Sequence, residues 1–147
     1  MKIKGIEINA RYRTVITFKR PSGNISFTLE AVNDYADFDQ ICPRPSAPWI
    51  QKAGEEKSIQ SFDDPAYKKQ IEEYSEHKIS WMILKTMAPS EVEWSTVDLR
   101  DPKTYNNWVA DMTAAGFTNA EINKLQNQIF TANGLGAAEI EVVEGNF

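Results

Sequence analysis

Apolar and polar residues tend to alternate over residues 1–32, with the two-residue period of half-buried strands. The most regular set is Ile25, Phe27 and Leu29. A Pro-Ser-Gly turn sequence precedes this set, so residues 13–31 are predicted to form a β-hairpin, with a further strand over 2–9 before it. Gly5 interrupts the phase of that first strand and is a candidate β-bulge. Together these elements predict a small antiparallel β-meander over residues 1–32.

The alternation stops at residues 33–63, which we interpret as a proline-containing connection. Three prolines lie in the sequence CPRPSAPW, from Cys42 to Trp49, and no period holds for long enough to make a helix or strand. Connections of this length are usually functional, disordered or packed as an extended strap over the body.

Residues 64–147 carry the signals of a mainly helical region. Asp64 followed by Pro65 is an N-cap with proline at the first helical position, and good helix formers continue to about Met87. Residues 91–99 alternate weakly and fit either a strand or an irregular turn. A second Asp-Pro pair at Asp101 then starts a helix that is expected to end at Gly116.

The last clear helix begins at Thr118. Thr118 is a good N-cap residue, and Glu121 three positions later completes a capping box. Its apolar residues form a narrow stripe of Ile122, Leu125 and Ile129, with Phe130 beside it. Asn and Gln side chains occupy most of the remaining surface. The stripe fits two roles, docking the helix onto the body or presenting it to a partner. Residues 136–143 are expected to begin a last short helix or a tail.

The predicted fold class is therefore α+β, a small N-terminal antiparallel β-meander followed by a mainly helical C-terminal region. With 147 residues and 41% hydrophobic residues, the chain is long enough to bury a core of its own. We expect residues 1–147 to form a single domain.

Charge and cysteine content exclude several classes of protein. The net charge of -5 argues against nucleic-acid binding, which needs clustered basic residues to neutralise phosphates. The sequence has no apolar run of membrane-spanning length and no signal peptide pattern, so no membrane partner is expected. Cys42 is the single cysteine and cannot close an internal disulfide, which suits a reducing cytoplasm.

The chemistry that catalysis requires is sparse. His77 is the only histidine, so a metal site with two imidazoles is excluded, and nothing near Cys42 in the sequence would activate its thiol. Glu91 and Glu93 are spaced to share a strand face, but exposed acids are a commoner explanation than an acid–base pair. We predict no catalytic, cofactor-binding or metal-binding residues.

The four tryptophans lie in apolar contexts, and burial in the core is the commoner role for them. Trp81 and Trp108 are predicted to be core residues. Trp49 lies in the proline-containing connection and is a candidate for packing onto a partner. The candidate partner-binding residues are Trp49, Ile122, Leu125, Ile129 and Phe130.

The serial order of motifs over residues 64–135 resembles the tail assembly chaperone family of tailed bacteriophages. The family pattern runs from an Asp-Pro-x-Tyr helix start, through Glu-Trp-x-x-Val-Asp and Asp-Pro-x-Thr-aromatic, to Ala-Gly-Phe-Thr-x-x-Glu-Ile and Ala-Asn-x-Leu. The matching positions are Asp64, Pro65, Tyr67; Glu93, Trp94, Val97, Asp98; Asp101, Pro102, Thr104, Tyr105; Ala115, Gly116, Phe117, Thr118, Glu121, Ile122; and Ala132, Asn133, Leu135.

The resemblance implies a non-enzymatic phage protein in the host cytoplasm that binds the helical tape-measure protein during tail morphogenesis. Amphipathic helices with partly uncovered stripes are compatible with holding an apolar helical client in a groove. Two alternatives stay open, a structural virion component of the tail or neck, and a small phage protein that acts on a host partner. Self-association also stays open.

Overall fold

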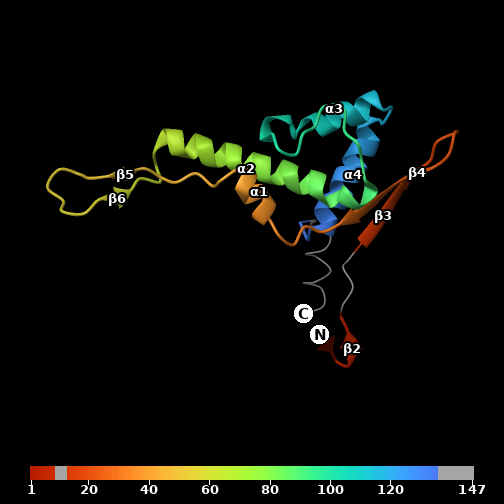
Figure 1. Cartoon of the computed structure of the whole chain (residues 1–147), viewed down its shortest axis with the longest axis horizontal. Coiled ribbons are helices and arrows are strands. Elements are labelled where there is room, and N and C mark those ends of the chain that lie inside the picture. Colours follow the sequence, from red (N-terminus) through yellow and green to blue (C-terminus); the bar gives the residue numbers. More distant parts are fainter. Residues whose placement is uncertain (9–12, 136–147) are drawn as a thin grey trace.

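The computed structural model describes residues 1–8 and 13–135 of the chain. It confirms the α+β class, with short antiparallel strand pairs towards the N-terminus and a mainly helical C-terminal region (Figure 1). The described strands pair only with their neighbours in sequence, as three separate two-stranded sheets. The antiparallel strands expected over residues 1–32 are thus present in the described residues, paired as two separate hairpins and not as one sheet.

The first strand pair is a miniature hairpin of β1 (Lys2–Ile3) and β2 (Ile6–Glu7). Lys4 and Gly5 between them both have positive φ, the conformation that a two-residue hairpin turn requires. Gly5 thus belongs to a chain reversal and is not a bulge in one strand over 2–9, since pairing of Ile3 with Ile6 places β1 beside β2.

The second pair is the predicted hairpin, β3 (Arg13–Phe18) and β4 (Ile25–Glu30). Its turn closes with the Gly23 amide donating to the Arg20 carbonyl at 3.1 Å. The register pairs Ile16 with Phe27 on the inner face, and the outer face is polar apart from Val15. One face of the hairpin is therefore available for burial.

The segment between this hairpin and the long helix contains short regular elements that the sequence pattern did not predict. A six-residue helix, α1 (Ala36–Ile41), buries Phe38 completely. The strands β5 (Trp49–Ile50) and β6 (Ile59–Gln60) then pair as a ribbon that projects away from the helices (Figure 1). Such short elements lack the several periods needed to produce a sequence signal.

The helical region follows the predicted boundaries at its first and last α-helices, whereas the single helix expected from Asp101 to Gly116 is a 3-10 turn followed by a shorter α-helix. Its helices are α2 (Pro65–Thr86), η1 (Ala88–Ser90), η2 (Pro102–Thr104), α3 (Asn107–Ala114) and α4 (Asn119–Ala132). The Asp64 side chain accepts the Tyr67 amide at 2.9 Å, which confirms the N-cap of α2. Both halves of the capping box at Thr118 and Glu121 are present. The stretch between η1 and η2 forms no strand, so the irregular alternative holds there.

The core lies where the inner face of the β3–β4 hairpin meets α2, α3 and α4. Trp81 and Trp108 are 3% and 2% exposed, which confirms both as core residues. Phe117, just before α4, contacts the rings of Phe18 and Phe27 with centroids 5.6 and 5.8 Å away. This aromatic cluster joins the hairpin to the helices.

Two polar contacts fix the hairpin in place. Ser90 accepts the amide of Thr28 at 2.8 Å and donates to the carbonyl of the same residue at 3.0 Å, so it occupies the outer edge of β4. At the turn end of the hairpin, the Arg20 guanidinium donates to both carboxylate oxygens of Glu121, at 2.6 and 2.9 Å. Bidentate pairs of this kind fix direction as well as distance.

Candidate functional site

The narrow stripe of α4 is buried within the chain itself. Ile122 is 4% exposed, and Leu125 and Ile129 are fully buried, because α4 lies against β3, β4, α2 and α3. Phe130 is half-buried and packs against the same core. The expectation of a partly uncovered stripe is therefore wrong: these side chains stabilise the fold and are not available to a partner in this structure.

Trp49 has the opposite environment. It is 68% exposed on the ribbon formed by β5 and β6. Of the five candidate partner-binding residues, it is the one that the structure leaves open to solvent, and it lies apart from the α4 stripe (Figure 1). The structure does not bring the five residues into one site.

A groove does lie between the helices, but other side chains form it. It has a volume of about 280 Å³ and lies where α2, α3 and α4 face one another. Its lining residues are Glu76, Ile79, Ser80, Ile83, Asn106, Trp108, Val109 and Gln126. Ile83 and Trp108 are buried, whereas Ile79 and Val109 are 49% and 39% exposed. The groove therefore combines an apolar base with two aliphatic side chains that water still reaches.

Polar groups accompany these aliphatic side chains. Ser80 donates to the Asn106 side-chain oxygen at 2.7 Å, which joins α2 to the start of α3. Gln126 lines the groove from the amide-rich face of α4. The groove therefore combines an apolar strip with a few neutral hydrogen-bonding groups and one acidic side chain, Glu76, which suits an amphipathic helix.

No sequence signal distinguishes Ile79 and Val109 from the other apolar residues of α2 and α3. Nothing in the helical period distinguishes a buried stripe residue from one at the edge of the stripe. The pairing of these two residues depends on how α2 and α3 face each other, which only the tertiary structure shows.

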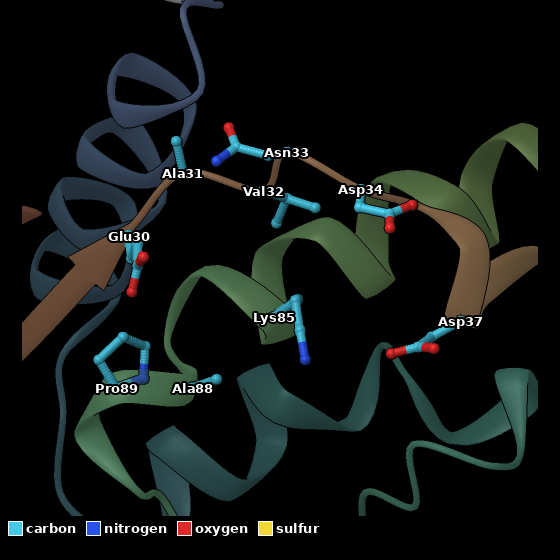
Figure 2. A pocket seen from close by; sticks show the side chains of 9 residues that line it. All are labelled: Glu30, Ala31, Val32, Asn33, Asp34, Asp37, Lys85, Ala88 and Pro89. Carbon is cyan, nitrogen blue, oxygen red and sulfur yellow. The ribbon is translucent and has the colours of Figure 1, made fainter. Parts of the chain in front are cut away.

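A larger hollow of about 430 Å³ lies where the chain leaves β4 and passes α2 (Figure 2). Glu30 is the last residue of β4, Asp34 lies on the segment that follows it, and Lys85 extends from α2 (Figure 2). Two of the acids have structural partners: Glu30 pairs with Arg13 at 3.1 Å, and Asp34 accepts the Ala36 amide at 2.8 Å. Among the described residues, no group of three or more His, Cys, Asp or Glu side chains is arranged to hold a metal ion.

The structure shows the surroundings of Cys42, His77 and Glu91, the titratable residues weighed in the sequence. Burial, and then the charge of Asp39, raise the pKa of the Cys42 thiol, which disfavours the reactive thiolate. The His77 ring packs edge-on against Tyr105, with centroids 6.4 Å apart. Glu91 has a left-handed backbone conformation at the end of η1 and does not share a strand face with Glu93.

Comparison of the chain with protein-family models, with curated proteins and with solved structures finds no match. Over the residues that the structure describes, none of the helices combines the length and apolar character needed to cross a membrane.

Proposed function

We propose that this chain is a non-enzymatic binding protein of the tail assembly chaperone type. It holds an apolar helical segment of a phage tape-measure protein in the host cytoplasm until tail subunits assemble around that client. The proposal draws on the ordered motif resemblance over residues 64–135 and on the groove between α2, α3 and α4.

The observation that carries the proposal is the partial exposure of Ile79 and Val109 at this groove. Covering exposed aliphatic side chains with a partner favours binding, by about 25 cal/mol for each Å² of apolar surface removed from water. A client helix that places one or two apolar side chains between Ile79 and Val109 would meet Trp108 and Ile83 below them. Gln126 and Asn106 lie within the same groove, where they can donate hydrogen bonds to polar groups of the client.

The test is co-expression with the tape-measure protein of the same phage, followed by capture of the complex. Ile79→Lys and Val109→Lys each place a charge in the groove, while lysine keeps good helix propensity. We expect each variant to lose at least tenfold in client affinity with the melting temperature little changed. Val15→Lys is the matched control, because Val15 is 61% exposed on the outer face of the β3–β4 hairpin, away from the groove.

Binding by apolar burial should also persist at moderately raised salt, since salt screens exposed charge pairs far more than buried apolar contacts. Client binding that both groove variants leave intact would contradict the proposal. Recovery of the chain at stoichiometric levels from finished virions, without client binding, would favour a structural role in the tail or neck.

A further inference from the structure

The groove between α2, α3 and α4 has an acidic side chain at its edge. Among the described residues that line the groove, Glu76 is the one with a charged side chain, and the others are apolar or neutral. Glu76 is exposed and lies three positions before Ile79, about 4.5 Å along the helix axis, so the two side chains share a face of α2. An acidic group therefore lies beside the apolar strip in which we place the client.

Glu76 has no cation beside it on its own helix. The residues three and four positions away on α2, which are its neighbours on the helix surface, are Glu72, Glu73, Ile79 and Ser80. Two of these four carry the same charge as Glu76. Within the part of the chain that the structure describes, none of the salt bridges includes Glu76. A carboxylate with acidic neighbours attracts a cation on a partner.

The lysines that follow Glu76 on α2 are directed to other surfaces. The Lys78 ammonium lies over the Tyr35 ring, 4.9 Å from its centroid. Lys85 extends into the hollow beside the segment that follows β4 (Figure 2). Residues 136–147 carry three glutamates and no lysine or arginine, so their side chains offer no cation to Glu76 either.

We propose that Glu76 selects a client helix that carries a lysine or arginine one turn from the apolar side chain it places between Ile79 and Val109. This inference rests on the proposed function and specifies its client as an amphipathic helix with a basic flank. Residues three or four positions apart lie on one face of a helix, so a client that fills the groove brings a base at that spacing close to the carboxylate. A client with an acid at the same position meets like charge and is disfavoured.

The test measures the affinity of the full chain for the tape-measure segment captured by co-expression. Glu76→Gln should weaken binding roughly two- to fivefold, the scale of an exposed ion pair. Glu76→Lys should weaken it further, because repulsion replaces attraction. Glu56→Lys is the matched control, since it makes the same change in net charge in the loop between β5 and β6, on the ribbon that projects away from the helices (Figure 1), and it should leave the affinity unchanged.

A charge swap identifies the partner of Glu76. In a second form of the segment, the lysine or arginine one turn from the apolar anchor is replaced by glutamate. This form should bind the unaltered chain weakly and the Glu76→Lys chain to within about twofold of the original pair. Such a rescue assigns the contact to the client and not to a basic residue of this chain, such as Arg11.

Salt dependence gives a second measurement of the same contact. Raising the salt from about 0.1 M to about 1 M shortens the screening length from about 10 Å to about 3 Å. The difference in affinity between the unaltered chain and Glu76→Gln should therefore disappear, while the apolar part of the binding persists.

The outcomes separate this inference from the proposed function. Client binding that Ile79→Lys and Val109→Lys weaken but both Glu76 variants leave unchanged would overturn the inference and support the groove. A captured segment with no base one turn from its apolar anchor, or a charge swap without rescue, would also overturn the inference alone. If the unaltered chain binds no tape-measure segment, both proposals are wrong. Circular dichroism of every variant checks that the fold is retained.

Discussion

The β3–β4 hairpin and the β5–β6 ribbon are both antiparallel strand pairs rich in apolar residues, yet one is part of the core and the other is exposed. On the hairpin, Phe27 is 6% exposed and Leu29 is fully buried. On the ribbon, Trp49 is 68% exposed and Ile50 is 38% exposed. Apolar content alone therefore does not explain which pair is buried.

The difference lies in the spacing of the apolar residues. Phe27 and Leu29 are two positions apart and share a face, whereas Trp49 and Ile50 are adjacent and point to opposite faces of their strand. A body of helices can cover one face of a strand pair, so it can bury the first arrangement completely and the second only in part. The ribbon consequently keeps exposed apolar surface on the described chain.

The largest expected difference is in the unfolding free energy lost when tryptophans of the two regions are replaced by alanine. Trp108→Ala and Trp81→Ala each remove a buried indole from the core and should cost about 3 to 5 kcal/mol of unfolding free energy. Trp49→Ala removes an exposed indole and should change stability by no more than about 0.5 kcal/mol when measured at low protein concentration. Denaturant melts of the three variants provide the comparison, and equal losses at all three positions would show that the assignment of core and ribbon is wrong.

A smaller effect is expected at Ser90, which bonds the edge of β4 to the helical region. Ser90→Ala leaves the amide and carbonyl of Thr28 without this partner and should cost about 1 to 2 kcal/mol. Ser26→Ala is the matched control, since Ser26 bonds Thr17 at 2.9 Å on the exposed face of the same hairpin. If both serine variants melt at the same denaturant concentration, Ser90 does not anchor the edge.

A substitution in the capping box measures how much this cap stabilises α4, the helix that packs against the β3–β4 hairpin. Thr118→Ala removes the side chain that accepts the Glu121 amide at 3.2 Å and should cost about 1 kcal/mol, within a range of roughly 0.5 to 2. Asn123→Ala, on the exposed side of α4, should leave stability unchanged or slightly raised, because alanine has the higher helix propensity. An unchanged thermal midpoint for Thr118→Ala would place the start of the helix elsewhere.

The smallest expected effect is the pH dependence of stability that arises from Arg20 and Glu121, the ion pair that joins the hairpin turn to α4. Hydrogen bonds from Arg20, and then from the Thr118 amide, lower the pKa of Glu121 from 4.5 to about 2. A lowered carboxylate pKa in the folded state gives stability that is complete above pH 4.5 and is lost as the pH falls towards about 2, because the unfolded chain binds the proton first. Both side chains are about one-fifth exposed, so solvent weakens the effect.

Glu121→Gln is the variant that isolates this contribution. Its unfolding free energy, followed by denaturant melts across the same acid range, should fall less steeply with decreasing pH than that of the unaltered chain. Identical slopes for the two proteins would show that Glu121 titrates normally in the folded state.

Much of the helical region could be predicted because its signals are local. The Asp64 cap, the capping box at Thr118 and Glu121, and the turn before β4 each depend on residues within a few positions of one another. Short-range hydrogen bonds of this kind form whenever the local chain conformation allows them, so the residue types reveal them. The candidate site was predicted less well, because burial of the α4 stripe and exposure of Ile79 depend on distant elements.

Asn133 illustrates which features follow from neighbouring residues and which depend on the tertiary structure. Asn133 followed by Gly134 is by residue type alone typical of a helix end, and Gly134 has the positive φ that such an end favours. Only the tertiary structure directs the Asn133 side chain to the Val32 amide at 2.9 Å and the Thr86 hydroxyl at 2.9 Å, which joins the exit of β4 to α2 and α4. The physical reason is the sequence separation, 101 residues in the first contact and 47 in the second: helix ends follow from neighbouring residues, whereas such contacts exist only after the distant segments have packed together.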